Sequence, residues 1–124
     1  MKITRIYADE QGESHFGQQT YPLHDVGKLG RLSETIPATG LILRTNEPGY
    51  DYDWHPAPAR QFVILLDGAI EIEVSDGERR VFRGGDIFLV EDTTGKGHRS
   101  RNIVPQERRS VFILLDHTSA QDSR

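Results

Sequence analysis

Hydrophobic and polar residues alternate in many short segments of this chain. The clearest case is IEIEV at residues 70–74, where three branched apolar residues alternate with two glutamates. A period of two gives a strand with one buried face and one wet face. The dipeptide Asp76-Gly77 follows, and it favours a two-residue turn because both positions tolerate positive φ. The pattern therefore predicts a β-hairpin from Ile70 to Phe82.

Comparable strand patterns recur along the chain, with glycine- or proline-containing turns between them. No window of a dozen residues keeps an apolar stripe at helical spacing, and the best candidate, Tyr21–Ile36, is interrupted by Pro22, Gly27 and Gly30. Strands that recur roughly every eight to twelve residues are typical of an all-β sandwich or barrel. The predicted strands are Ile3–Tyr7, His15–Gln19, Leu41–Thr45, Asp51–His55, Gln61–Leu66, Ile70–Val74, Arg79–Phe82, Ile87–Val90, Gly97–Arg101 and Ser110–Leu115.

Two segments depart from alternation because they are almost continuously apolar. They are FVILLD at residues 62–67 and VFILLD at residues 111–116. Continuous apolar runs of this length are typical of strands that are covered on both faces. Their likeness is too short to define a repeat, so we interpret them as two independent core strands.

Length, composition and net charge exclude several classes of protein. A chain of 124 residues and 14.0 kDa predicts one domain, spanning residues 1–124, with a polar tail at residues 118–124 that we expect to fray. There is no cysteine, which excludes disulfides, thiolate metal sites and a cysteine nucleophile. A net charge of −4, the lack of a long apolar run and the lack of an apolar signal core predict a cytoplasmic protein that binds neither nucleic acid nor membrane. The basic residues Arg99, Arg101, Arg108 and Arg109 are predicted to lie on the surface.

Two of the five histidines lie in positions suited to a site. His55 ends a predicted strand, Gln61 begins the next one after a short Pro-Ala-Pro-Ala link, and His98 follows a glycine-rich bend. Strand alternation groups Asp53 with His55 and sends Trp54 to the opposite face. If these faces point into a small antiparallel barrel, His55, Gln61 and His98 meet inside it.

These residues carry a resemblance to the two motifs of the cupin superfamily. Gly49, His55, Gln61 and Gly68 follow the spacing of the first motif, at about residues 49–68. Residues 85–102 resemble the second motif, which begins at Gly85 and ends with His98 and Asn102. Glu91 stands where proline is usual, and the loop before His98 is two residues longer than usual. The resemblance implies a jelly roll, also called a double-stranded β-helix.

The resemblance also implies a divalent metal (Fe, Mn, Ni or Zn) held by three histidines and one glutamate. Here Ala57 and Gln61 occupy two of the four ligand positions, so His55 and His98 remain, with Gln61 as a neutral third ligand. The alternative is that the three residues are hydrogen-bonding groups of a metal-free pocket for an organic ligand. Asp53, by its face, and Asn102, by its motif position, are the candidate substrate-binding residues.

The neighbours of these residues are assigned more ordinary roles. Tyr50, Tyr52 and Trp54 are predicted to lie outside or at the mouth of the barrel, and Arg60 is predicted to face away from Gln61 and to pair with an acid. The loop at residues 91–97 is interpreted as a tight bend that needs positive φ.

Two functions remain open from the sequence, beside a weaker third possibility, an oligomeric structural protein. The first is a metal-dependent enzyme of dioxygenase, isomerase, decarboxylase or lyase type, with its small-molecule ligand inside the barrel. The second is a non-catalytic small-molecule-binding cupin with a vestigial metal site. In either case the resemblance implies a homodimer.

Overall fold

A computed structural model describes residues 1–115, and almost all of its regular structure is β. The predicted fraying at residues 118–124 lies outside this described part. A one-turn 3₁₀ helix (η1) spans Gly27–Leu29. The strands are β1 (Lys2–Ala8), β2 (Ser14–Thr20), β3 (His24–Asp25), β4 (Arg31–Leu32), β5 (Ala38–Asn46), β6 (Asp51–His55), β7 (Gln61–Leu65), β8 (Ala69–Val74), β9 (Arg79–Arg83), β10 (Ile87–Val90), β11 (His98–Asn102) and β12 (Arg108–Leu115).

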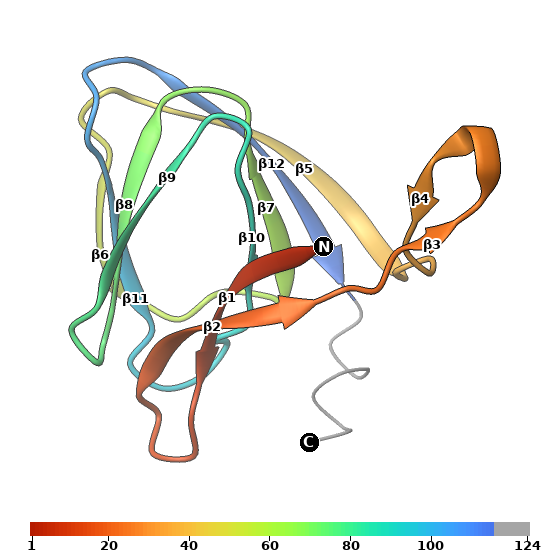
Figure 1. The fold of residues 1–124 in the computed structure, drawn as a ribbon. Coiled ribbons are helices and arrows are strands. Elements are labelled where there is room, and N and C mark those ends of the chain that lie inside the picture. Colours follow the sequence, from red (N-terminus) through yellow and green to blue (C-terminus); the bar gives the residue numbers. More distant parts are fainter. Residues whose placement is uncertain (116–124) are drawn as a thin grey trace.

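The strands form two main sheets that face each other (Figure 1). The larger sheet has the order β2-β1-β10-β7-β12-β5, and the smaller has the order β6-β11-β8-β9. All main-sheet pairings are antiparallel except that of β1 with β10. No strand ladder joins the two sheets within residues 1–115, so the predicted barrel is an open jelly-roll sandwich rather than a closed cylinder.

Each of the ten predicted strands is present, with ends shifted by at most three residues. The two apolar runs become β7 and β12, which are neighbours in the middle of the larger sheet. The sequence pattern missed the short β3–β4 ribbon, which projects from the body in Figure 1 and consists of exposed residues. Strands of two residues are too short to show alternation.

The hydrophobic core lies between the sheets. The alternating residues Ile70, Ile72 and Val74 of β8 are buried there and pack with Val63 and Leu65 of β7. A second, smaller cluster covers part of the opposite face of the larger sheet, around Ile3, Phe62, Leu89 and Leu115. This cluster explains why β7 is apolar on both faces.

Glu91 has a structural role at its unusual motif position. Its two carboxylate oxygens accept hydrogen bonds from Nε of Arg5 at 2.7 Å and from Nε of Arg60 at 2.5 Å, and its side chain is almost fully buried. Burial alone would raise the pKa of Glu91, but the Arg60 hydrogen bond and the charge of Arg5 hold it below its usual value. The prediction that Arg60 pairs with an acid is confirmed. The ion triad therefore ties β1 to the loop that precedes β7.

None of the helical structure in residues 1–115 has the length or apolarity needed to cross a membrane.

Candidate functional site

A cavity of about 350 Å³ opens between the two sheets. Its walls are mostly apolar, with Val63, Phe88 and Phe112 from the larger sheet and Ile70 and Ile72 from the smaller one. Cavities of this size and character are typical of small-molecule sites. Within residues 1–115 no aspartate or glutamate lines it, whereas His55, His98, Gln61, Arg44 and Arg108 do.

The structure brings His55 and His98 together. They are paired across the β6–β11 ladder, and their ring centroids lie 4.7 Å apart. Gln61 lines the same cavity from β7 in the facing sheet. The predicted convergence of these three side chains is therefore present in the fold.

Each imidazole is held through its Nδ1 atom. Nδ1–H of His98 donates to the carboxylate of the fully buried Asp92 at 2.7 Å, and Nδ1–H of His55 donates to the backbone carbonyl of Asp53 at 2.7 Å. Since both partners are pure acceptors, Nδ1 carries the proton in each ring. Burial lowers the pKa of His55, which favours its neutral form. In a neutral ring fixed this way, the Nε2 atom is a free acceptor or ligand.

The donor set of the cavity is incomplete for a typical cupin metal centre. Among residues 1–115 no group of three or more histidine, cysteine or carboxylate side chains is placed to hold a metal ion. The Gln61 carboxamide makes no hydrogen bond within the described chain, and Ala57 fills the position of another ligand with a methyl group. The protein groups that would neutralise a divalent cation are missing.

A β-bulge changes which residues of β6 face the cavity. His98 pairs with His55 and Ser100 with Tyr52, so three steps along β6 match two along β11. Tyr52 therefore lines the cavity beside His55, and the exposed Asp53 does not. The parity argument that grouped Asp53 with His55 is wrong, because one extra residue reverses the alternation. Tyr52, predicted to lie outside or at the mouth of the barrel, lines the cavity and is 50% exposed.

Tyr50 and Trp54 are the other two aromatic residues of this segment. Tyr50, also predicted to lie outside or at the mouth, lines the cavity, and its hydroxyl lies 2.9 Å from the Ser100 hydroxyl. Trp54 lies outside as predicted, 40% exposed, with the Arg99 guanidinium 5.3 Å from its ring.

Asn102 does not line the cavity but holds a residue that does. Its Oδ1 accepts a hydrogen bond from Nε of Arg108 at 2.7 Å, and its Nδ2 donates to the backbone carbonyl of Glu47 at 2.8 Å. Arg108 is only 3% exposed and lines the cavity, so its predicted surface position is wrong. Arg99, Arg101 and Arg109 lie on the surface as predicted.

The glycine-rich loop at residues 91–97 positions His98 through close backbone contacts. Gly95 and Gly97 have φ of 80° and 73°, as the sequence predicted. A Cβ on Gly97 would lie 2.0 Å from the carbonyl oxygen of His55, and one on Gly95 would lie 2.4 Å from that of Gly12. The loop therefore packs against β6 on one side and against the β1–β2 turn on the other, where the amide of Lys96 donates to the Gly12 carbonyl at 2.9 Å.

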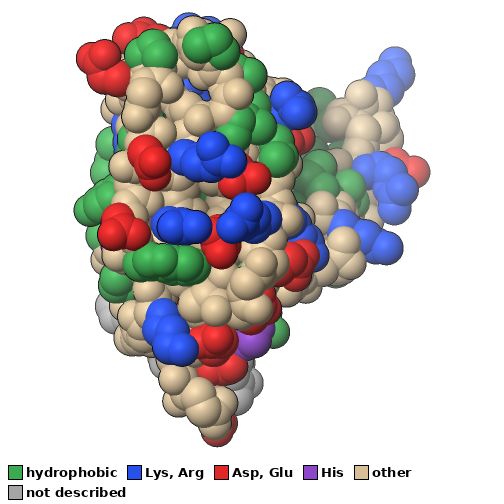
Figure 2. All heavy atoms as spheres, turned by 90° about the vertical axis from the view of Figure 1, so that its left-hand side faces the viewer, with side chains coloured by type: hydrophobic (Ala, Val, Ile, Leu, Met, Phe, Trp, Pro, Cys, Tyr) green, Lys and Arg blue, Asp and Glu red, His purple; other side chains and the backbone are tan. Residues whose placement is uncertain are grey.

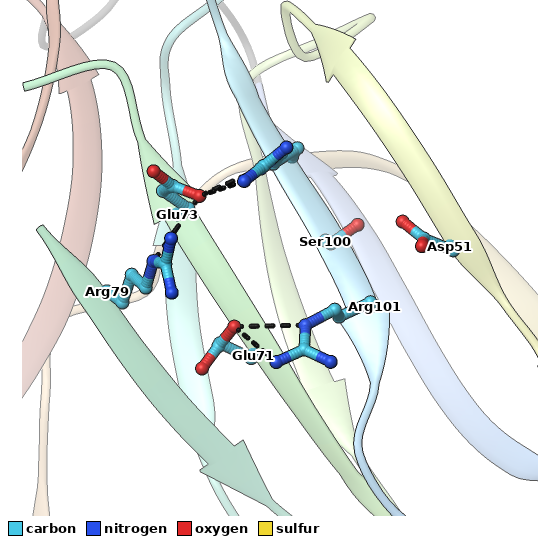
Figure 3. Close-up of a pocket in the computed structure, with 7 residues that line it drawn as sticks. Asp51, Glu71, Glu73, Arg79, Ser100 and Arg101 are labelled. Carbon is cyan, nitrogen blue, oxygen red and sulfur yellow. Dashed lines mark hydrogen bonds and ion pairs between the residues drawn. The ribbon is translucent and has the colours of Figure 1, made fainter. Parts of the chain in front are cut away.

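A second hollow lies on the outer face of the smaller sheet, and within the described chain all of its lining charges except Asp51 are paired. Glu73 contacts Arg99 and Arg79, and Glu71 contacts Arg101 (Figure 3). Figure 2 shows basic and acidic side chains intermingled over this part of the surface. Because these acidic and basic side chains pair with one another, we assign the functional site to the cavity between the sheets.

No protein-family model matches the chain. It is 33% identical over 83 residues to oryzines biosynthesis cluster protein J of Aspergillus oryzae, covering 65% of this chain and 45% of that protein. It is 32% identical over 72 residues to the uncharacterized protein YdbB of Bacillus subtilis, covering 57% and 58%. The chain thus spans about half the length of the curated relatives it matches.

Solved structures establish the fold. The cupin domain of Schizosaccharomyces pombe Cnp3 matches with a TM-score of 0.53 at 18% identity, covering 98% of this chain and 88% of that one. A cupin 2 conserved barrel domain protein from Salinispora arenicola matches at 0.51 and 22% identity, covering 66% of each chain. A protein with a double-stranded β-helix domain from Klebsiella pneumoniae matches at 0.51 and 17% identity, covering 92% and 86%. The chain has the fold of a small cupin, as its motifs implied.

Proposed function

We propose that this small cupin domain binds a small organic molecule in the cavity between its sheets. The observation that carries the proposal is the convergence of the His55 and His98 imidazoles and Gln61 in a cavity with mostly apolar walls. None of these three groups has a hydrogen-bond partner among residues 1–115, and each can meet a polar atom of a ligand. The apolar walls would bury the remainder of that ligand.

The residues present fit a metal-free site better than a four-ligand metal centre. No carboxylate of the described residues lines the cavity, and the cationic Arg44 and Arg108 line the same walls as the two imidazoles. Two imidazoles and a neutral amide bind a divalent ion less well than three imidazoles and a carboxylate.

One observation favours a second candidate, a metal-dependent enzyme with Fe, Mn, Ni or Zn at His55, His98 and Gln61. Histidines that bind metals usually donate Nδ1–H to a carboxylate or a backbone carbonyl, as His98 and His55 do here. A ligand or water would have to complete such a centre.

Metal content separates the two candidates. The protein is purified without chelator, and its metal is measured by elemental analysis for the wild type, for His98→Ala and for His24→Ala, a control at an exposed histidine. We expect less than stoichiometric metal in all three proteins. Stoichiometric metal in the wild type and the control, lost in His98→Ala, would replace the metal-free proposal with the second candidate.

Ligand binding is followed at the proposed contacts themselves. In NMR titrations of the metal-free protein with small aromatic and aliphatic fragments, we expect shifts of the His55 and His98 ring signals and of the Gln61 side-chain amide. Fragments that perturb only outer-face residues such as Trp54 would contradict the proposed site.

A further inference from the structure

We propose that the ligand of this cavity is an amphipathic organic carboxylate whose charged group is bound by Arg108 and Arg44. This inference rests on the proposed small-molecule site and adds the chemical class of the ligand. It is carried by a buried guanidinium that has only neutral partners and by a second cation beside it.

Arg108 is a buried cation that no carboxylate among residues 1–115 contacts by a hydrogen bond or ion pair, although the charge of Asp67 acts on it from a distance. It is 3% exposed, and its Nε and one Nη donate to the amide oxygens of Asn102 and Asn46 at 2.7 and 2.8 Å. The other Nη has no hydrogen-bond acceptor among residues 1–115, although Arg108 lines the cavity. Burial lowers the pKa of Arg108, which shows how little solvation its charge retains. An anion in the cavity would supply the missing countercharge through strong, charge-assisted hydrogen bonds.

Arg44 places a second guanidinium at the same part of the cavity. It lies 5.3 Å from the Tyr50 ring and 5.3 Å from the Phe112 ring, and the Arg108 guanidinium lies 5.3 Å from that same Tyr50 ring. Arg44 makes no hydrogen bond or ion pair within the described residues and lines the cavity. Burial lowers the pKa of Arg108 most, and the nearby charge of Arg44 lowers it further. Two adjacent cations in a cavity that no acid among residues 1–115 lines favour a bound anion.

The placement of cavity residues along β11 and β8 limits the shape of the ligand, as the arginines limit its charge. His98 begins β11, whereas Asn102, which holds Arg108, ends it. Four residues of extended strand span roughly 13 Å, so the backbone positions of His98 and of the asparagine that holds Arg108 lie well apart along the cavity. Ile70 and Ile72 of the neighbouring β8 line the stretch between them. A carboxylate with an apolar body would fill this arrangement, whereas a bare inorganic anion would leave the apolar walls unused.

A purely structural role accounts for only part of the arrangement. Through Asn46 and Asn102, Arg108 links the ends of β5 and β11 to the start of β12. That role uses two nitrogen atoms of the guanidinium. It gives no account of the remaining Nη or of Arg44, which holds no strand in place through a hydrogen bond.

The test compares matched probes that differ only in charge. Hexanoate is titrated against hexanamide, and benzoate against benzamide, by calorimetry at low ionic strength and neutral pH with the wild type, Arg44→Gln and Arg83→Gln. Arg83 is an exposed arginine of β9 outside the cavity, so its variant has the same change in net charge. We expect each carboxylate to bind at least tenfold more tightly than its amide. We expect Arg44→Gln to weaken carboxylate binding at least fivefold and to leave amide binding unchanged, and Arg83→Gln to change neither.

Arg108→Gln is measured alongside, with its folding checked by circular dichroism. Loss of the carboxylate preference in a folded Arg108→Gln supports the inference, and Arg44→Gln decides it if Arg108→Gln unfolds. Equal binding of amides and carboxylates, or carboxylate binding unchanged in Arg44→Gln, would overturn the anionic class and leave the small-molecule site intact. Binding of neither kind of probe by the wild type would reject the inference together with the proposed site.

Discussion

Tyr52 stacks on His55, with ring centroids 4.0 Å apart and ring planes 13° from parallel. The two residues share a face only because the β6 bulge reverses the alternation between them. The tyrosine ring therefore covers one face of the imidazole. This contact contributes to the burial that lowers the pKa of His55.

Replacing Tyr52 should therefore raise the pKa of His55. In Tyr52→Ala the imidazole gains solvent, so its pKa should move up toward the ordinary value of 6.5, measured by NMR titration of the ring signals in metal-free protein. Trp54→Ala, two residues along on the outer face, is the control and should leave the His55 pKa unchanged. An unchanged titration in Tyr52→Ala would show that the sheet alone desolvates His55.

Gly97 should tolerate alanine much less well than Gly77. Both have positive φ, 73° and 100°, but a Cβ at Gly77 meets nothing within 4 Å, whereas one at Gly97 collides with the His55 backbone. Gly77→Ala should cost about 1–3 kcal/mol of unfolding free energy from backbone strain alone. Gly97→Ala should cost more and should also weaken ligand binding, because His55 must shift. Denaturant unfolding measures both variants, and equal losses would contradict a steric role for Gly97.

His15 should stabilise the fold only over a limited pH range. Its ring lies 2.7 Å from a carboxylate oxygen of Asp9 and 2.7 Å from one of Asp76, joining the β1–β2 hairpin to the β8–β9 turn. The Asp9 and Asp76 hydrogen bonds raise the His15 pKa above 6.5, so this contribution is complete below pH 6.5 and is lost as pH rises through the raised value. The hydrogen bond with His15 is the main cause that lowers the pKa of Asp9 below 3.8. The hydrogen bond from the Glu78 amide is the main cause that lowers the pKa of Asp76 below 3.8. The carboxylate contribution is therefore present above pH 3.8 and is lost as pH falls through those lowered values.

The difference in melting temperature between wild type and His15→Gln should consequently be larger near pH 5 than near pH 9. His24→Gln is the control, since that histidine is exposed and its nearest carboxylate, on Glu34, is 3.8 Å away. A difference that does not vary with pH would show that His15 contributes packing rather than charge.

We expect the protein to form a homodimer. Leu41 and Leu43 are 61% and 75% exposed on one face of β5, the edge strand of the larger sheet, and the half-buried Val111 and Ile113 lie opposite them on β12. An unpaired edge that carries exposed leucines favours association with a second copy. Light scattering should give twice the 14.0 kDa chain mass for the wild type and for Leu29→Lys, a control on the β3–β4 ribbon. Leu43→Lys should be monomeric, and a monomeric wild type at high concentration would contradict the expectation.

The sequence predicted the strands and the meeting of His55, Gln61 and His98 because both follow from local pattern and motif spacing. It misplaced Asp53 because a bulge depends on how two strands pair, and nothing in the sequence of β6 marks it. It placed Arg108 on the surface because its charge suggested solvent, and the two asparagines that hold it lie far along the chain or on another strand. Asp92 is the acid that orients His98. The only sequence signal for this role is weak: Asp92 lies in the predicted bend, six residues before the histidine.

The two motif segments are not enough to build this pocket. Gly12 of the first hairpin touches Gly95, and the hydroxyl of Ser14 donates to the Gly97 carbonyl at 2.6 Å. A shortened chain that began after Thr20 would retain every motif residue, yet the bend in front of His98 would lose its outer wall. The amino-terminal hairpin therefore supports an imidazole more than eighty positions away. Any engineered fusion or truncation at that end should be judged by its effect on ligand binding.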